Sequence, residues 1–249
     1  MKKTLLLTFC MFALSIVTFA QDFSVSAEVE SRYVWRGQPL GGSVPSFHPS
    51  MSFEYKGLEV GAWGAYSFSK NPSQELDLYV SYTFWKEMFT VIVTDYCFPG
   101  ESYETRYFNY HNATTPHVFE AGVSFNGTEK VPIGVSLYTN FFGADAKKAN
   151  GKNLFSTYAE VSYNPSIEKI GVEFSVFCGA ALNGQSYIIG EDEFLGFYGN
   201  KGFSVVNVGV SASKSFSIKD KVEIPLTTKL IFNPAANQAY LSVGAGIKL

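Results

Sequence analysis

The stretch ELDLYVSYTF, residues 75–84, shows most clearly which fold this chain adopts. Apolar residues occupy every second position of the stretch, and polar or hydroxyl-bearing residues lie between them: Leu76, Leu78, Val80, Tyr82 and Phe84 alternate with Glu75, Asp77, Tyr79, Ser81 and Thr83. Successive side chains of a β-strand point to opposite faces of the sheet. The period of two therefore predicts a strand with one apolar face and one polar face.

The same alternation continues through most of the chain and predicts about twelve strands. Each has an apolar face opposite a face that carries Glu, Asp, Arg, Ser and Thr. The expected strands are Phe23–Arg36, Met51–Lys56, Leu58–Phe68, Glu75–Phe84, Phe89–Tyr96, Val118–Phe125, Ile133–Phe141, Thr157–Tyr163, Val172–Cys178, Phe203–Ser213, Ile224–Phe232 and Tyr240–Leu249.

The connections between these strands alternate between long and short. The long ones are residues 37–49, 97–117, 142–154 and 182–202, and the short ones are Gly57 and residues 85–88, 126–130, 164–170 and 216–221. The connection at residues 69–74 is of medium length. Outer-membrane barrels have short periplasmic turns and longer outer loops, whereas a soluble sandwich follows no such rule. An even number of strands then puts both termini on the periplasmic side.

Composition excludes several classes of protein. Charged residues make up 16% of the chain, against about 25% in an ordinary soluble domain, and aromatic residues also make up 16%. A disordered chain is rich in charge and poor in aromatics. Net charge is −3, or −5 once Lys2 and Lys3 are removed, because 17 basic then stand against 22 acidic residues. With no basic patch, nucleic acid is not an expected partner.

The N-terminal residues have the pattern of a secretory signal. Lys2 and Lys3 precede an apolar run, Leu5–Ile16, and the small residue Ala20 marks the expected cleavage site. The expected organisation is a signal peptide at residues 1–20 and one domain at residues 21–249. Beyond the leader no continuous apolar run has the length of a membrane helix.

Export without a helical anchor leaves two classes, a soluble exported protein or an outer-membrane barrel, since only helices and closed barrels satisfy their backbone in lipid. Aromatic residues gather near the expected strand ends, as in interfacial girdles: Tyr33, Trp35, Tyr66, Phe68, Phe84, Trp85, Tyr96, Phe141, Tyr163 and Phe232. The final strand alternates up to Leu249, as barrels that end inside their last strand do.

We therefore predict an all-β protein with a single antiparallel transmembrane β-barrel in the cell outer membrane. Its expected partners are outer-membrane lipid and, through the last strand, the barrel-assembly machinery.

Residues 31–37, SRYVWRG, resemble the Ser-x-Tyr-x-x-Arg-Gly opening of the TorF-like family of outer-membrane porins. Phe98-Pro99, the segment from His117 to Phe125 and the segment Phe232-Asn233-Pro234 are similar as well. The resemblance implies a signal peptide, a barrel of about this length and an outer-membrane location. It implies no particular solute and brings no functional residues with it.

Candidate catalytic and metal-binding residues are few. His48 and Ser50 have the His-x-Ser spacing of outer-membrane lipid hydrolases, but Pro49 separates them and no Asn follows the serine. His111 and His117 flank a loop and are too few for a metal site. Cys97 and Cys178 form neither a zinc motif nor a disulfide framework. We expect no enzyme activity, no cofactor and no metal.

Charged residues on the expected inner face are the candidate functional residues. They are Glu28, Glu30, Arg32, Arg36, Glu54, Lys56, Asp77, Glu120, Glu160, Glu173 and Lys229. Such residues either line a path for small polar solutes or pair with one another and fill the lumen, which would leave a structural or adhesive barrel. Arg36 is expected near the outer mouth, as a fixed positive charge or as half of a structural pair with Glu28, Glu30 or Glu54. The first hypothesis is a porin-like channel, and the least favoured is a lipid hydrolase.

Overall fold

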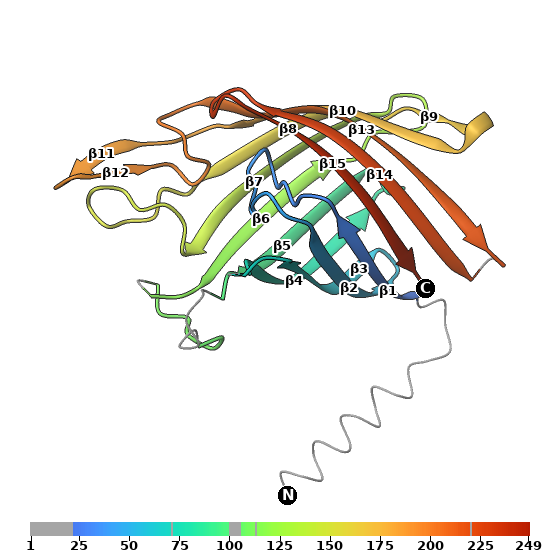
Figure 1. Ribbon diagram of the computed structural model, residues 1–249, viewed down its shortest axis with the longest axis horizontal. Helices are drawn as coiled ribbons and strands as arrows, with labels where there is room; N and C mark the ends of the chain where they lie inside the picture. Colours follow the sequence, from blue (N-terminus) through green and yellow to red (C-terminus); the bar gives the residue numbers. More distant parts are fainter. Residues whose placement is uncertain (1–21, 71, 100–105, 113, 220) are drawn as a thin grey trace, which may run out of the picture.

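The computed structural model describes residues 22–70, 72–99, 106–112, 114–219 and 221–249. The expected signal peptide lies outside these residues. Twelve long antiparallel strands make up the wall of a closed barrel (Figure 1). They are β1 (Asp22–Glu30), β2 (Ser46–Tyr55), β3 (Leu58–Ser67), β4 (Gln74–Phe84), β5 (Phe89–Cys97), β6 (His117–Phe125), β7 (Ile133–Gly143), β8 (Thr157–Tyr163), β10 (Val172–Ala181), β13 (Ser204–Ile218), β14 (Val222–Asn233) and β15 (Gln238–Lys248).

Each strand of the wall pairs with the next one along the chain, and β15 pairs with β1 to close the barrel. Three short elements lie outside this order: β9 (Ser166–Ile167) adds to the edge of β10, and β11 (Ser186–Ile189) pairs with β12 (Asp192–Leu195) as a separate hairpin. A single turn of 3-10 helix, η1 (Glu168–Ile170), follows β9. The predicted all-β fold with twelve barrel strands is confirmed. No helix within the described ranges is long and apolar enough to span a membrane.

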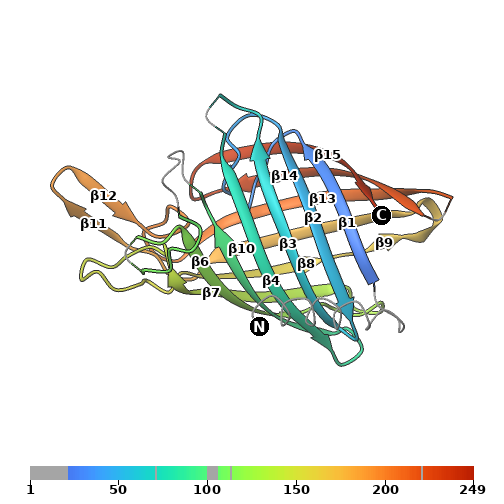
Figure 2. The same cartoon turned by 90° about the horizontal axis from the view of Figure 1, so that it is seen from below.

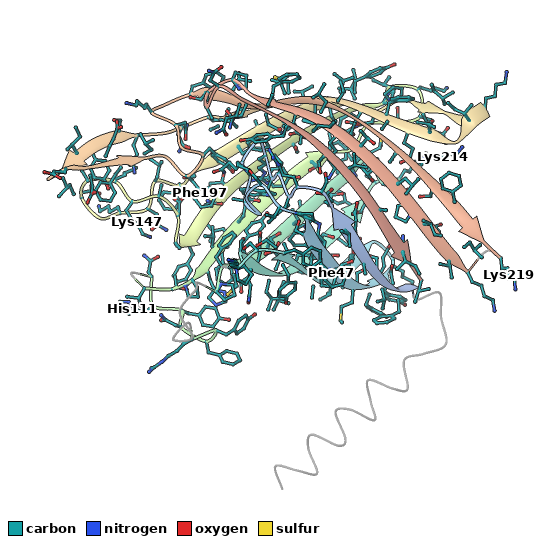
Figure 3. All side chains as sticks on the ribbon, viewed as in Figure 1. Phe47, His111, Lys147, Phe197, Lys214 and Lys219 are labelled. Atoms are coloured by element: carbon teal, nitrogen blue, oxygen red, sulfur yellow. The ribbon has the colours of Figure 1, made fainter. Side chains whose placement is uncertain are left out.

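The two ends of the barrel differ in the length of their connections. The turn end carries the tight connections, such as residues 56–57 and 85–88, and also the start of β1 and the end of β15, because Ser26 pairs with Lys248. The loop end carries the long connections, and the β11–β12 hairpin extends beyond it (Figure 2). Figure 3 shows Lys214 and Lys219 toward the turn end and Lys147 and His111 toward the loop end.

The outer face of the wall is mostly apolar, although Lys214 on β13 and Asp95 on β5 occupy outward positions as well. Along β7, for example, Ile133, Val135, Leu137 and Phe141 are 41–46% exposed. Residues at the alternate positions of each strand, such as Ser136 on β7, point into the barrel, as the period of two requires. The alternation seen in the sequence thus separates an apolar exterior from a polar interior.

Aromatic rings on the inner face lie flat against the wall because glycines of the neighbouring strand leave room for them. A Cβ atom on Gly61 would lie 2.4 Å from the Tyr79 ring, and one on Gly122 would lie 2.4 Å from the Tyr138 ring. These glycines therefore allow bulky side chains inside a barrel of this size.

The first strand is shorter than predicted. The alternation suggested Phe23–Arg36, but β1 ends at Glu30, which pairs with Ser46, the first residue of β2. Residues 31–45, which we call the plug segment, turn into the lumen at the loop end. Tyr33 packs against His48 and Trp63 there, with ring centroids 5.1 and 5.4 Å away. Tyr33 is therefore not a girdle residue, because it lies inside the barrel and is 8% exposed.

Lys56 differs from its prediction too. It was expected on the inner face of the second strand, but it occupies a two-residue turn with Gly57. Both residues have positive φ, 50° for Lys56 and 82° for Gly57, which is the geometry of the type I′ turn that suits tight hairpins. The Lys56 ammonium lies 5.1 Å from the centroid of the Tyr55 ring.

The buried hydrophobic core of the molecule lies inside the barrel at the loop end. It consists of Tyr158, Ala181, Tyr198 and Val206, with Trp35, Tyr138 and Phe197 packed against it. Tyr198 and Phe197 belong to the connection between β12 and β13, and Trp35 belongs to the plug segment. Two long connections therefore meet the wall inside the lumen.

Candidate functional site

Arg36 lies at the centre of this core. Its Nη1 donates to Glu120 Oε2 at 2.5 Å and its Nη2 donates to Glu120 Oε1 at 2.9 Å, so the ion pair is bidentate. Nη1 also donates to the Tyr198 hydroxyl oxygen at 2.8 Å. The side chains of Arg36 and Glu120 are 10% and 2% exposed. A bidentate pair with so little water around it is among the stronger ionic contacts in proteins.

Aromatic rings enclose the Arg36 guanidinium. Its central carbon lies 4.4 Å from the Trp35 ring centroid, 4.3 Å from that of Tyr138 and 4.6 Å from that of Tyr158. All three are within the range of a cation–π contact. We call Glu120, Tyr96, Tyr138 and Tyr158, which come from four adjacent strands, the cation cage.

Glu120 is fixed in the cage by its neighbours on the wall. The Tyr96 hydroxyl donates to Glu120 Oε1 at 3.0 Å. The pairing of β6 with β7 shifts register between Phe119 and Glu120, and such irregularities redirect side chains. The wall therefore helps to position the Glu120 carboxylate, in addition to the two hydrogen bonds from Arg36 of the plug segment.

The tip of the plug segment has the backbone of a tight turn. Trp35 and Gln38 exchange two backbone hydrogen bonds of 2.8 Å, and the residues between them, Arg36 and Gly37, have φ of 47° and 78°. A Cβ atom at Gly37 would lie 1.9 Å from the Val206 carbonyl oxygen, so only glycine fits. Asn233 Nδ2 donates to the Gly37 carbonyl at 3.0 Å.

These contacts show that the tip crosses the lumen. Gly37 rests on β13 and β14, whereas Arg36 reaches Glu120 on β6. In the sheet order β10, β8 and β7 lie between β13 and β6. The segment thus connects opposite walls of the barrel at the loop end.

Carboxylates dominate the inner face of the strands near the plug segment. They are Glu28, Glu30, Glu75, Asp77, Glu120 and Glu160, against the basic residue Lys229 and the imidazole of His48. Lys229 Nζ contacts Glu30 Oε1 at 2.5 Å. The pairing expected between Arg36 and Glu28, Glu30 or Glu54 is not found, because Arg36 pairs with Glu120.

Two of the carboxylates are buried without full hydrogen bonding. Glu75 and Asp77 are 3% and 7% exposed, and Glu75 Oε1 and Asp77 Oδ1 have no hydrogen-bond partner. Tyr33 of the plug segment bonds to Glu75. Burial, and after it the charge of Glu75, raises the pKa of the Tyr33 hydroxyl well above its usual range.

Of the remaining predicted residues, Arg32 and Glu54 lie apart from the cage, whereas Glu160 contacts Tyr158 of the cage. The Arg32 guanidinium is 5.6 Å from the Tyr240 ring centroid. Glu160 accepts hydrogen bonds from Tyr158 and from Asn207. Glu54 is exposed near the turn end of β2.

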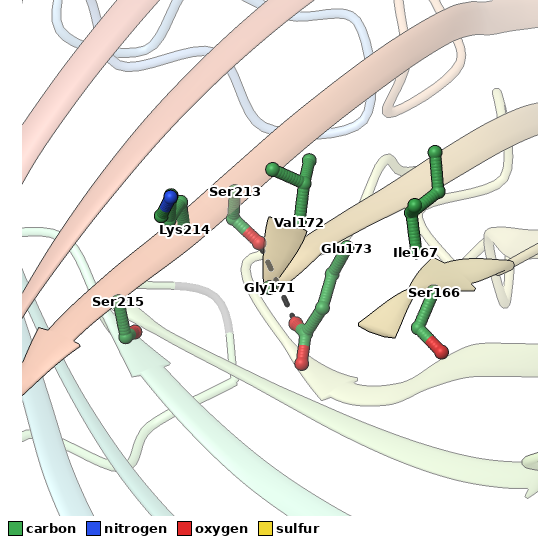
Figure 4. Close-up of a pocket in the computed structure, with 8 residues that line it drawn as sticks. All are labelled: Ser166, Ile167, Gly171, Val172, Glu173, Ser213, Lys214 and Ser215. Atoms are coloured by element: carbon green, nitrogen blue, oxygen red, sulfur yellow. Dashed lines mark hydrogen bonds between the residues drawn. The ribbon is translucent and has the colours of Figure 1, made fainter. Parts of the chain in front are cut away.

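Glu173 lies in a pocket of about 210 Å³ at the turn end (Figure 4). Residues of β9, β10 and β13 line it, and Ser213 Oγ donates to a Glu173 carboxylate oxygen at 3.5 Å. The bond is long and the pocket is far from the cage, so Glu173 takes no part in the site at the loop end.

His48 and Ser50 do not form a dyad. His48 Nε2 bonds Ser46 Oγ at 2.8 Å, and Ser50 Oγ bonds Ser26 Oγ at 2.6 Å. Both side chains point into the lumen.

His117 and the cysteines lie elsewhere on the wall. His117 Nδ1 contacts Asp95 Oδ1 at 2.7 Å beneath the β5–β6 connection. Cys97 is buried and Cys178 is exposed, and both are free thiols. Within the described ranges, no three His, Cys, Asp or Glu side chains are arranged to hold a metal ion.

The aromatic half of the site was missed by sequence reasoning. Tyr138 and Tyr158 sit at polar positions of their strands, where a large ring is unusual, and this was an available signal. Tyr96 was expected in the interfacial girdle, but it points inward. Tyr198 and Trp35 come from connections, and nothing local in the sequence places them in the lumen.

Comparison with known proteins gives one family. The sequence model of a family described as "Bacterial protein of unknown function (Gcw_chp)" matches residues 16–175. This range includes the plug segment and all four residues of the cation cage. No curated protein matches the chain.

Proposed function

Because this chain belongs to the Gcw_chp family of bacterial proteins of unknown function, we propose its role from its own geometry: it is an outer-membrane, porin-like barrel that passes small polar solutes. The observation that carries the proposal is the separation of faces, with mostly apolar side chains outside and most of the charged ones inside. In the proposed orientation the termini and tight turns are periplasmic, and the long connections face outward. The resemblance of residues 31–37 to the TorF-like porins supports the same role.

The lumen favours cations in this proposal. Carboxylates outnumber basic groups on the described inner face, and Glu75 and Asp77 keep unpaired oxygens. A ring of acidic side chains selects for cations. The plug segment restricts the passage at the loop end, so solute flow requires it to move.

The barrel carries no reaction in this proposal, and its partners are lipid, the barrel-assembly machinery and the solute. A barrel that stays closed and serves a structural or adhesive role is the second candidate. It is favoured by the plug segment across the lumen and by the β11–β12 hairpin that projects from the loop end. Conductance distinguishes the two candidates.

Membrane fractionation tests the location directly. The protein is expected in the outer-membrane fraction, and its folded form is expected to migrate differently from the heated form on gels. Recovery as a soluble periplasmic protein would refute the proposal.

Paired arginine substitutions on β7 test which face meets lipid. Leu137→Arg places a charge on the outer face near mid-strand, where lipid contact costs about 2–4 kcal/mol of folding free energy. Ser136→Arg, one residue away, points into the lumen beside Glu160 and is expected to cost less than about 1 kcal/mol. Urea unfolding from lipid vesicles measures both values. If Leu137→Arg is the milder change, the outer face is in water.

A further inference from the structure

We propose that the cation cage is a binding site for a small alkylguanidinium solute, and that Arg36 occupies it as an internal substitute for that solute. The inference rests on the proposed function, since it assigns the chemical class of a ligand to the lumen of the barrel.

The cage remains when Arg36 leaves. Glu120, Tyr96, Tyr138 and Tyr158 belong to β6, β5, β7 and β8, so the wall and not the plug segment sets the positions of their backbones. Glu120 offers two oxygens to a planar fork of N–H donors, as it does to Arg36 at 2.5 and 2.9 Å. Tyr138 and Tyr158 offer ring faces at 4.3 and 4.6 Å from the guanidinium carbon. A carboxylate and aromatic faces together recognise an organic cation.

Two further buried carboxyl groups lie beside the cage and have hydrogen-bonding capacity that is not used. Asp77 pairs in register with Tyr96, which bonds to Glu120. Asp77 and its neighbour Glu75 are more than nine-tenths buried, and each has an oxygen with no hydrogen-bond partner. Buried polar groups are costly unless they are hydrogen-bonded. Withdrawal of Arg36 would therefore leave the Glu120 carboxylate without its partner, next to two carboxyl groups with open acceptor positions, and favour entry of another cation with N–H donors.

The geometry favours a guanidinium over an ammonium group. A guanidinium presents a planar fork that matches a carboxylate with two parallel hydrogen bonds and also stacks on aromatic faces. An ammonium ion is a compact, strongly hydrated point charge. A hydroxyl-lined inner face leads toward the cage from the turn end, with Ser26, Ser50, Ser136 and Ser211 among its residues. This lining suits a polar solute.

The Arg36→Ala variant empties the cage and provides the test. The full chain is refolded in detergent, and its thermal unfolding is followed with millimolar methylguanidinium, methylammonium or urea. We expect methylguanidinium to raise the unfolding temperature of Arg36→Ala and to bind at least tenfold more tightly than methylammonium, with no effect of urea. Wild type is expected to respond far less, because Arg36 fills the site.

Two further variants keep the test decisive. Adding Glu120→Gln to Arg36→Ala is expected to abolish the response, since the paired oxygens are lost. Should Arg36→Ala fail to fold, Gly37→Ala undocks the tip while leaving the cage intact, and it should respond in the same way.

Equal responses of wild type and variant, or no preference for methylguanidinium over methylammonium, would overturn the inference. Binding in detergent needs neither membrane insertion nor conductance, so its absence would remove the site and leave the proposed barrel function standing.

Discussion

Replacing Arg36 by Glu is expected to release the plug segment from the lumen. The substitution removes the bidentate pair with Glu120 and brings a second carboxylate to within contact distance of the first. Breaking a buried ion pair by changing one partner costs about 3–5 kcal/mol. Each 1.4 kcal/mol is about tenfold in an equilibrium constant, so the open state should gain at least about a hundredfold. If Arg36 were instead a free positive charge at the outer mouth, Arg36→Glu would change only the ion selectivity and would not open the lumen.

Swelling of protein-containing vesicles in small sugars measures the effect of Arg36→Glu. A much faster swelling rate is expected for Arg36→Glu than for wild type. Arg32→Glu is the matched control, because Arg32 lies on the same segment and contacts the Tyr240 ring instead of a buried carboxylate. The double exchange Arg36→Glu with Glu120→Arg should restore part of the closure. An Arg36→Glu barrel that folds and swells at the wild-type rate would show that the ion pair does not hold the segment in place.

Gly37→Ala is expected to undock the tip even though Arg36 is unchanged. The added Cβ atom would lie 1.9 Å from the Val206 carbonyl oxygen, on a backbone with φ of 78°. Gly42→Ala is a close control, since Gly42 has φ of 73° but nothing within 4 Å of the added atom. Gly42→Ala should cost only the strain of a non-glycine residue in the left-handed conformation, about 1–2 kcal/mol, whereas Gly37→Ala should lose the docking contact as well.

Fluorescence of Trp35 reports the position of the tip. Trp35 packs on Tyr198 with ring centroids 5.9 Å apart, so its emission should shift to the red and become accessible to quenchers when the tip leaves the lumen. The chain has 3 Trp residues, and Trp63 and Trp85 are replaced by Phe to isolate the signal. A similar shift in Gly42→Ala and Gly37→Ala would mean that the contact with Val206 is not what positions the tip.

The strands of the wall were predictable because their signal is local. In Leu76–Phe84 the alternation by itself fixes which side chains face outward, and the structure follows it over the whole of β4. The same signal misled at residues 31–36, where Tyr33 and Trp35 continue the apolar period beyond Glu30. β1 ends at Glu30, where it pairs with Ser46, the first residue of β2. The alternation within one strand carries no information about where the partner strand begins.

The site was predictable only in part, for a related reason. Glu120 was expected to face inward from its strand, but its partner Arg36 is 84 residues away in sequence. Tyr198 is 162 residues from Arg36. Contacts between a folded-in connection and the opposite wall depend on the closure of the barrel, and no spacing within the chain encodes them. Lys56 was misplaced for a local reason. The alternation alone predicts that the strand continues through Lys56, but Lys56 and Gly57 both have positive φ and turn the chain there.

Single-channel current through planar lipid bilayers tests the central claim most directly, that this is a membrane barrel whose lumen the plug segment restricts. Wild type and Arg36→Glu are recorded under the same salt gradient. We predict that wild type is closed for most of the recording and that Arg36→Glu gives sustained steps with a reversal potential that favours cations. Wild-type steps as large and as long as those of Arg36→Glu, or the absence of current from both proteins, would contradict the account.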